Sequence, residues 1–246
     1  MLIVLTMFLL GTLFGFIGAG GAGFVIAVLT VFFGVPIHMA LGTSLAAMAF
    51  TSISGAYSHY REGNTHVKIG LIVGGFAAAG SFGGAKLAAV IPEESLHWLT
   101  AGMLFLSAFL LFIKLLFLKD TSKPVDEKSH VIWIKGIFLG LLAGTLSGTF
   151  GIGSAPFIQI GLMILLHLTI RQSVGTTMLV IVPLAIGGGI GYFSEGFIDV
   201  FLLLKVLIGT ACGAYIGAKF TNIVPKPVLK SAIILTPTAA AVLLLF

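Results

Sequence analysis

Long apolar runs separated by short polar stretches make up most of this sequence. Eight of the runs are long enough to cross a bilayer as a helix, which takes about 20 residues. They span residues 2–33, 39–60, 67–89, 96–118, 132–166, 172–193, 200–221 and 228–246. Their apolar positions are continuous, whereas the strands of a membrane β-barrel alternate apolar and polar positions. The pattern therefore predicts membrane-spanning helices.

The polar stretch 119–131 divides the runs into a first transmembrane unit, residues 1–118, and a second, residues 132–246. The opening run of each unit is interrupted, by G-A-G-G-A-G at 18–23 and by G-I-G-S-A-P at 151–156. Inside a helix glycine costs about 1 kcal/mol relative to alanine and proline about 3 kcal/mol. Each opening run is therefore either one long broken helix or a re-entrant hairpin that returns to its starting side.

The two units are copies of one another. Residues 11–113 align without a gap to residues 144–246 at an offset of 133, and 29 of the 103 aligned positions are identical. The identities include motifs as well as apolar residues, such as G-T at 42–43 and 175–176, and E-G at 62–63 and 195–196. Membrane transporters are often built from such duplicated units. Because the opening run has an internal copy, we expect it to be structural rather than a cleaved leader.

Basic residues decide between the two interpretations of the opening runs. If the runs re-enter, 11 of the 13 Lys and Arg residues fall on one side, with Lys86 and Lys205 as the exceptions. A single crossing would split them about seven to five. Because cytoplasmic loops are rich in Lys and Arg, we predict re-entrant hairpins and inverted repeats. The protein would then be a multi-pass protein of the cell (inner) membrane. Its linker would lie in the cytoplasm, and both termini would lie on the outer side.

Composition agrees with this class. The chain is 58% hydrophobic and 9% charged, with a mean hydropathy of +1.18, whereas soluble domains carry about 25% charged residues. The predicted fold class is all-α, a polytopic helical membrane protein whose solvent is the lipid bilayer. The net charge of +5 lies mostly in short connections, so no nucleic-acid partner is expected. Cys212 is the single cysteine, and we expect neither a metal site nor a cofactor.

The glycine-rich stretches carry the leading candidates for solute binding, namely Gly20, Gly21, Gly153 and Ser154. A broken helix exposes backbone N–H groups, and its N-terminal end carries a partial positive charge. Together these features bind an anion without a charged side chain. The alternative is close helix packing, for which Gly11/Gly15 and Gly144/Gly148 have the small-xxx-small spacing.

Polar side chains form a second group of candidates. Hydroxyls at four positions would donate to an anion or bond within their own helix: Thr43, Ser44, Thr176 and Thr177. Gln159, in an apolar stretch, would contact the solute or a neighbouring helix. Arg171 and His59 lie at the ends of runs, where they would bind an oxyanion, carry a proton or anchor the membrane interface.

These motifs resemble the sulfite exporter TauE/SafE family over nearly the whole chain. The resemblance rests on the paired glycine-rich stretches, G-T-S at 42–44, G-T-T at 175–177, S-G-A-Y-S-H-Y-R-E-G-N at 54–64 and G-G-A-K at 83–86. It implies transport of a sulfur-containing anion, such as sulfite or an organosulfonate, without nucleotide hydrolysis. Ser154 and Ala155 depart from the further glycines usual in the family, and the several cysteines of thiosulfate-handling relatives are not matched.

No metalloprotease, serine-hydrolase or P-loop motif is present, so we do not expect an enzyme. We expect a secondary transporter, an exporter of a small sulfur-containing anion that works by alternating access. A passive anion channel and a non-transporting membrane assembly protein are the alternatives. The sequence is also compatible with a homo-oligomer.

Overall fold

The computed structural model describes residues 1–17, 22–117, 130–152, 155–220 and 226–245, and the regular secondary structure in those ranges is all helical. The first unit forms α1 (Leu2–Ile17), α2 (Ala22–Val31), α3 (Ile37–Arg61), α4 (Val67–Val90) and α5 (Glu93–Phe117). The second unit forms α6 (His130–Phe150), α7 (Ala155–Leu166), α8 (Ile170–Ser194), α9 (Val200–Phe220) and α10 (Lys226–Leu245). The predicted all-α fold class is confirmed.

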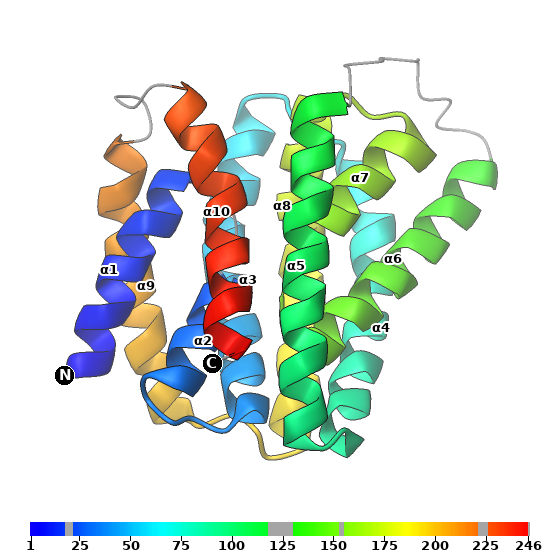
Figure 1. The fold of residues 1–246 in the computed structure, drawn as a ribbon. Helices are drawn as coiled ribbons and strands as arrows, with labels where there is room; N and C mark the ends of the chain where they lie inside the picture. The colour runs from blue at the N-terminus through cyan, green and yellow to red at the C-terminus, as the bar shows by residue number, and fades with distance from the viewer. Residues whose placement is uncertain (18–21, 118–129, 153–154, 221–225, 246) are drawn as a thin grey trace.

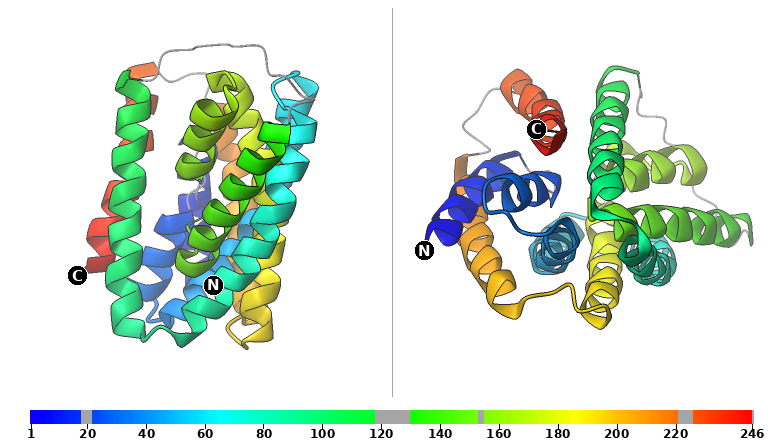
Figure 2. Two further views of the ribbon diagram at one scale, coloured as in Figure 1. Left: turned by 90° about the vertical axis from the view of Figure 1, so that its right-hand side faces the viewer. Right: turned by 60° about the horizontal axis from the view of Figure 1, so that its bottom comes forward.

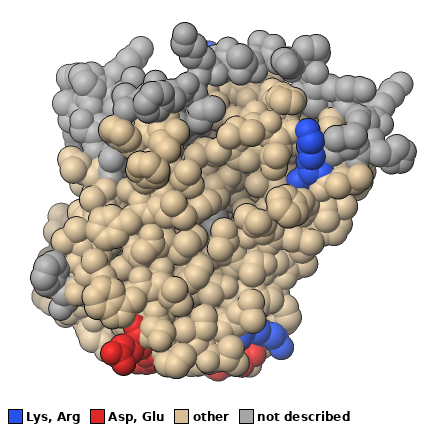
Figure 3. All heavy atoms as spheres, turned by 45° about the vertical axis from the view of Figure 1, so that its right-hand side comes forward, with Lys and Arg blue, Asp and Glu red and all other residues tan. Residues whose placement is uncertain are grey.

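The surface is that of a protein in lipid. Within the described residues, five helices are long and apolar enough to cross a membrane: α3, α4, α5, α6 and α8. Large apolar side chains such as Phe50, Trp98 and Phe201 are exposed, which would be unusual on a soluble monomer. On the face drawn in Figure 3, the charged side chains of the described residues lie near the two ends, and the described surface between them is uncharged.

The chain reverses at each break. In Figure 1, α1 rises from the lower end and α2 returns to that end, where α3 begins. Likewise, α6 descends from the upper end and α7 returns to it. Both opening runs therefore follow the course of a re-entrant hairpin, with α2 in the lower half of the molecule and α7 in the upper half. The two marked termini lie towards the lower end.

The two units exchange their opening helices. Helix α1 packs against α9 of the second unit, and α6 packs against α4 of the first, as Figure 2 shows. Helices α3 and α8 contact each other in the centre, and α5 contacts α10. The units are thus interleaved, so the most extensive helix–helix contacts lie between the copies rather than within one of them.

Glycines make this exchange possible. A Cβ atom at Gly144 of α6 would collide with the backbone of Ala77 on α4, and one at Gly11 of α1 would collide with the backbone of Thr210 on α9. Ala77 and Thr210 are 133 residues apart, as are the two glycines. Both units therefore make the same backbone-to-backbone contact, so Gly11 and Gly144 are packing residues, as is Gly148, whose Cβ would meet Ser81.

The repeated E-G pairs end two helices in the same way. Gly63 follows α3 with a φ of 71°, and Gly196 follows α8 with a φ of 77°. Glycine adopts this left-handed conformation without the steric strain that a Cβ atom would cause. The conformation lets the next N–H groups bond to carbonyls of the last helical turn. The backbone N–H of Asn64 donates to the His59 carbonyl at 2.9 Å, and the backbone N–H of Phe197 donates to the Tyr192 carbonyl at 2.9 Å.

Two adjacent glycines on α4 test the packing. A Cβ atom at Gly84 would lie 2.9 Å from the Thr149 backbone nitrogen, whereas one at Gly83 would meet nothing within 4 Å. We expect Gly84→Ala to destabilise the protein by about 1–3 kcal/mol through overpacking. Gly83→Ala should leave stability unchanged or raise it, because alanine is the better helix former. Thermal unfolding of the purified protein in detergent measures both; equal melting temperatures would contradict the α4–α6 contact.

Candidate solute-binding site

The described residues of the two breaks lie next to each other inside the molecule. A Cβ atom at Gly23, the second residue of α2, would be 3.3 Å from Cγ2 of Ile152 in the second break, and it would collide with Leu104 of α5. Gly151 has a φ of 66°, and a Cβ atom there would lie 2.7 Å from Cδ2 of Leu41 on α3. The start of α2 and the approach to α7 therefore meet in the interior, with α3 and α5 beside them.

Side chains from neighbouring helices bond to the backbone at both breaks. The Ser44 hydroxyl of α3 donates to the Ala22 carbonyl at 3.0 Å and fixes the first turn of α2. The Tyr192 hydroxyl of α8 donates to the Gly148 carbonyl at 2.8 Å, near the end of α6. Carbonyls in the last turn of a helix have no partner within it, and lipid offers none. The Tyr192 hydroxyl therefore satisfies a carbonyl that the second break exposes, whereas Ser44 adds a tertiary contact to a carbonyl that α2 itself can pair.

Five buried hydroxyl groups have no hydrogen-bond partner among the residues that the structure describes: those of Thr43, Thr65, Ser81, Thr100 and Ser147. Ser147 lies on the last turns of α6, directly before the second break. Thr100 lies one helical turn before Leu104 on α5 and so shares the face that contacts Gly23. A buried hydroxyl without a partner carries a desolvation cost. The described residues therefore leave the hydrogen-bonding capacity of Ser147 and Thr100 unmet.

The structure separates the residues that the sequence singles out. Gly20, Gly21, Gly153 and Ser154 lie outside the described residues. Of the hydroxyl residues, Ser44 is at the first break. Thr43, its neighbour on α3, is fully buried with no partner among the described residues.

The corresponding hydroxyls of α8 are engaged within the protein. Thr176 accepts a hydrogen bond from the His66 backbone N–H at 3.0 Å, which ties α8 to the α3–α4 connection. Thr177 donates to the Ser173 carbonyl of its own helix at 2.7 Å. Gln159 is half-buried on α7 and interacts with another group of the protein. Of the two alternatives for Thr177, donation to an anion or a hydrogen bond within its own helix, the structure shows the second.

Arg171 and His59 lie at the upper end, away from the breaks. Arg171 is exposed on the first turn of α8, where Thr169 and Gln172 form a capping box. His59 is on the last turn of α3, with Nδ1 3.8 Å from a carboxylate oxygen of Glu62. The structure therefore does not bring these two side chains together with the glycine-rich stretches.

Sequence reasoning missed Tyr192, Ser147 and Thr100. One signal was present for Tyr192, because its counterpart at the offset of 133 is His59. A Cβ atom at Gly42 would meet Tyr192, and one at Gly175 would meet Cβ of His59, so equivalent residues of the two copies contact the glycine of the G-T motif. Ser147 and Thr100 have no such signal, since a single hydroxyl in an apolar run is usually bonded within its own helix.

Comparison with known proteins identifies the family. A model of the sulfite exporter TauE/SafE family matches residues 3–244. The chain belongs to the TauE/SafE family. It is 70% identical over 246 residues, covering all of both chains, to the probable membrane transporter protein YdhB of Bacillus subtilis (strain 168).

More distant relatives agree. The chain is 28% identical to the probable membrane transporter protein ORF9 of Sinorhizobium sp, covering 97% of this chain and 91% of the relative. It is 27% identical to the probable membrane transporter protein YjnA of Bacillus subtilis (strain 168), covering 92% of each. No solved structure matches the chain significantly. This TauE/SafE protein is therefore a membrane transporter, and the family and these names are those of transporters rather than enzymes.

The Tyr192 hydroxyl tests how the second break is held. We expect Tyr192→Phe to lower the free energy of unfolding by about 1–2 kcal/mol, because the Gly148 carbonyl loses its partner in a buried position. Tyr60→Phe, at an exposed position near the end of α3, is the matched control and should change little. Thermal unfolding in detergent compares the two, and equal stabilities would show that the hydroxyl does not hold the break.

Proposed function

We propose that this TauE/SafE protein exports sulfite or a closely related small sulfur-containing anion, and that the anion binds where the two breaks meet. The observation that carries the proposal is the proximity of Gly23, at the start of α2, to Ile152, three residues before the start of α7. Each helix N-terminus is equivalent to roughly half a positive charge and presents unpaired N–H groups. Two such ends facing one interior position attract an anion without Lys or Arg.

The unpaired hydroxyls support the same position. Thr100 and Ser147 are buried donors beside the breaks, and the oxygens of an oxyanion are acceptors. Hydrogen bonds to a charged acceptor are roughly twice as strong as neutral ones. The substrate class comes from the family model, which is named for sulfite exporters.

Alternating access would follow from an inverted arrangement of the two units. Helix α2 reaches the lower end and α7 the upper end (Figure 1), so each half-helix would close one side of the pathway. The close backbone contacts of α1 with α9 and of α6 with α4 make these pairs the rigid bodies. Rocking would therefore occur between interleaved pairs that each contain helices of both units, rather than between the units themselves.

Orientation is tested with reporters. With a cytoplasmic linker, alkaline phosphatase fused after Phe246 should be active and green fluorescent protein fused there should be dark. A reporter inserted in the stretch 119–131 should give the opposite pair of results. A fluorescent C-terminal fusion would contradict the proposed orientation.

Sulfite flux tests the function itself. Purified protein in liposomes should move radiolabelled sulfite, and the rate should saturate with concentration because the anion occupies a site. Gly20→Leu and Gly153→Leu should abolish flux, and Gly75→Leu, where a Cβ meets open space, should not. Absence of flux for sulfite and for organosulfonates would refute the proposal, and flux that never saturates would indicate a channel.

The hydroxyl donors have a matched control. Thr100→Val and Ser147→Ala should each weaken the apparent sulfite affinity about tenfold. Thr145→Ala, which removes a hydroxyl bonded to its own helix on α6, should leave the affinity unchanged. If all three variants behave alike, the donors do not contact the anion.

A further inference from the structure

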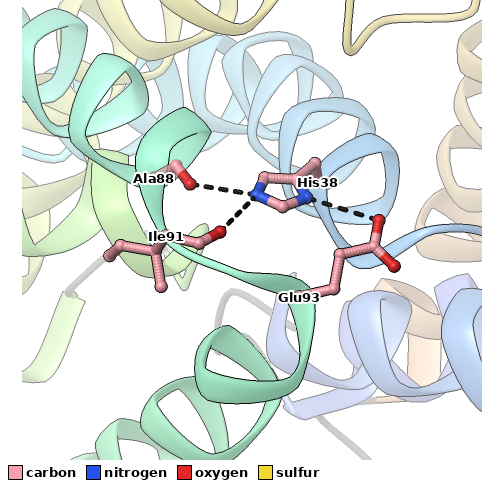
Figure 4. A network of polar contacts seen from close by, with 4 residues as sticks. All are labelled: His38, Ala88, Ile91 and Glu93. Atoms are coloured by element: carbon pink, nitrogen blue, oxygen red, sulfur yellow. Dashed lines mark hydrogen bonds and ion pairs between the residues drawn. The ribbon is translucent and has the colours of Figure 1, made fainter.

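His38 occupies a built polar position at the lower end. It lies on the first turn of α3 and is 5% exposed. Its Nε2 is 2.9 Å from the Ala88 carbonyl and 3.2 Å from the Ile91 carbonyl, and its Nδ1 is 3.5 Å from Oε1 of Glu93 (Figure 4). The ring also stacks on Phe197, with centroids 4.7 Å apart. One imidazole therefore joins α3 to the α4–α5 connection and to the α8–α9 connection.

The partners of His38 define its protonation. Carbonyl oxygens only accept hydrogen bonds, so Nε2 must carry a hydrogen to bond to Ala88 and Ile91. A neutral ring then presents the lone pair of Nδ1 to the carboxylate of Glu93, and the two repel. A doubly protonated ring donates on both sides. The contact shown in Figure 4 is therefore complete only when a proton is bound.

Other ionisable groups at this end are placed differently. Lys86 of α4 pairs with Glu195 at 3.9 Å, and the Asp199 carboxylate accepts hydrogen bonds from the backbone of α9. Glu94 and His97 of α5 line a neighbouring cleft of about 390 Å³ between α2, α5 and α10, and His97 lies close enough to feel the charges of both Glu93 and His38. The connection from α2 to α3, residues 32–36, carries no charge. Glu93 is thus the carboxylate paired with His38.

A proton can reach this pair from solution. The Glu93 side chain is 59% exposed, whereas that of His38 is 7% exposed. The carboxylate therefore faces both the aqueous end and the buried ring, so it can pass a proton between them.

The second unit lacks a titratable equivalent. At the offset of 133, the counterpart of His38 is Arg171 and the counterpart of Glu93 is Lys226. Arginine stays protonated at every physiological pH, whereas histidine changes charge between about pH 5 and 8. The repeat therefore places a proton-sensitive contact at the lower end and a permanently charged residue at the corresponding upper position.

We propose that His38 is a proton-binding site that controls access at the lower end of the transporter, an inference that rests on the proposed function for its role in transport. With a proton bound, His38 ties α3 to the α4–α5 connection and holds this end closed. Release of the proton breaks the pair with Glu93 and frees α3. The same helix carries Ser44, which bonds to the first turn of α2, so the change reaches the first break.

Thiol labelling tests the gate without any substrate. Ala88 is fully buried beside His38, so Ala88→Cys, made together with Cys212→Ala, reports opening through reaction with a maleimide. The labelling rate is divided by that of the same cysteine in a His38→Gln protein, which cancels the pH dependence of the thiol itself. We expect this ratio to rise about fivefold from pH 5 to pH 8, as the ion pair is lost. A constant ratio would overturn the proposal.

Neighbouring carboxylates give a matched pair of variants. Glu93→Gln should remove the pH dependence of labelling, and its exposed side chain makes misfolding a small risk. Glu94→Gln, one residue away and outside the His38 contact, should retain the dependence. If Glu94→Gln removes it and Glu93→Gln does not, the proton site is misassigned and the proposal fails.

Flux measurements separate this proposal from the function on which it rests. In liposomes, the ratio of sulfite flux at pH 5 to that at pH 8 should be the same in the wild type and in Glu94→Gln, and should differ from it in Glu93→Gln and His38→Gln, because sulfite's own protonation affects all four proteins alike. If sulfite flux depends on pH equally in all four proteins, His38 does not control transport. If no protein moves sulfite but labelling follows the expected pattern, the gate stands and the proposed substrate fails.

Discussion

Lipid neither donates nor accepts hydrogen bonds, so every backbone polar group at membrane depth needs a partner inside the protein. A complete helix meets this requirement by itself, but α2 and α7 are half-length helices that begin in the interior. Ser44 bonds to the first turn of α2 and Tyr192 to the end of α6, so α3 and α8 must lie against the breaks. In the proposed function, the N–H groups at the starts of the half-helices are the groups that bind the anion.

Close backbone contact is the second constraint on the architecture. At Gly144 and Gly11 the opening helix of one unit meets the backbone of a helix in the other, without side chains between them. Such contacts tolerate little sliding, because a shift brings a Cβ atom against backbone. The α1–α9 and α4–α6 pairs are therefore stiff, whereas the short helices α2 and α7 are held by hydrogen bonds and apolar side chains. Rocking of one such pair against the other is the movement that the proposed alternating access requires.

The two units share their backbone contacts but differ in their ionisable residues. Equivalent glycines and helix ends make equivalent contacts in both units, because these contacts involve backbone and tolerate few alternatives. Ionisable positions have diverged, as His38 against Arg171 and Glu93 against Lys226 show. A pathway built from two similar halves can therefore respond differently to the solutions at its two ends, although the same backbone framework supports both.

The sequence by itself determined the helical class, the duplication, the helices to within three residues at each end and the position of both breaks. These features follow from local properties, namely apolar run length, glycine and proline content and a fixed offset. Tertiary structure decided which helices exchange between units, that Ser44 and Tyr192 hold the breaks, and that Arg171 and His59 lie elsewhere. It also decided that His38 faces a carboxylate. Contacts of this kind depend on how distant segments pack. The sequence therefore does not show which hydroxyl group or aromatic ring in an apolar run makes a tertiary contact.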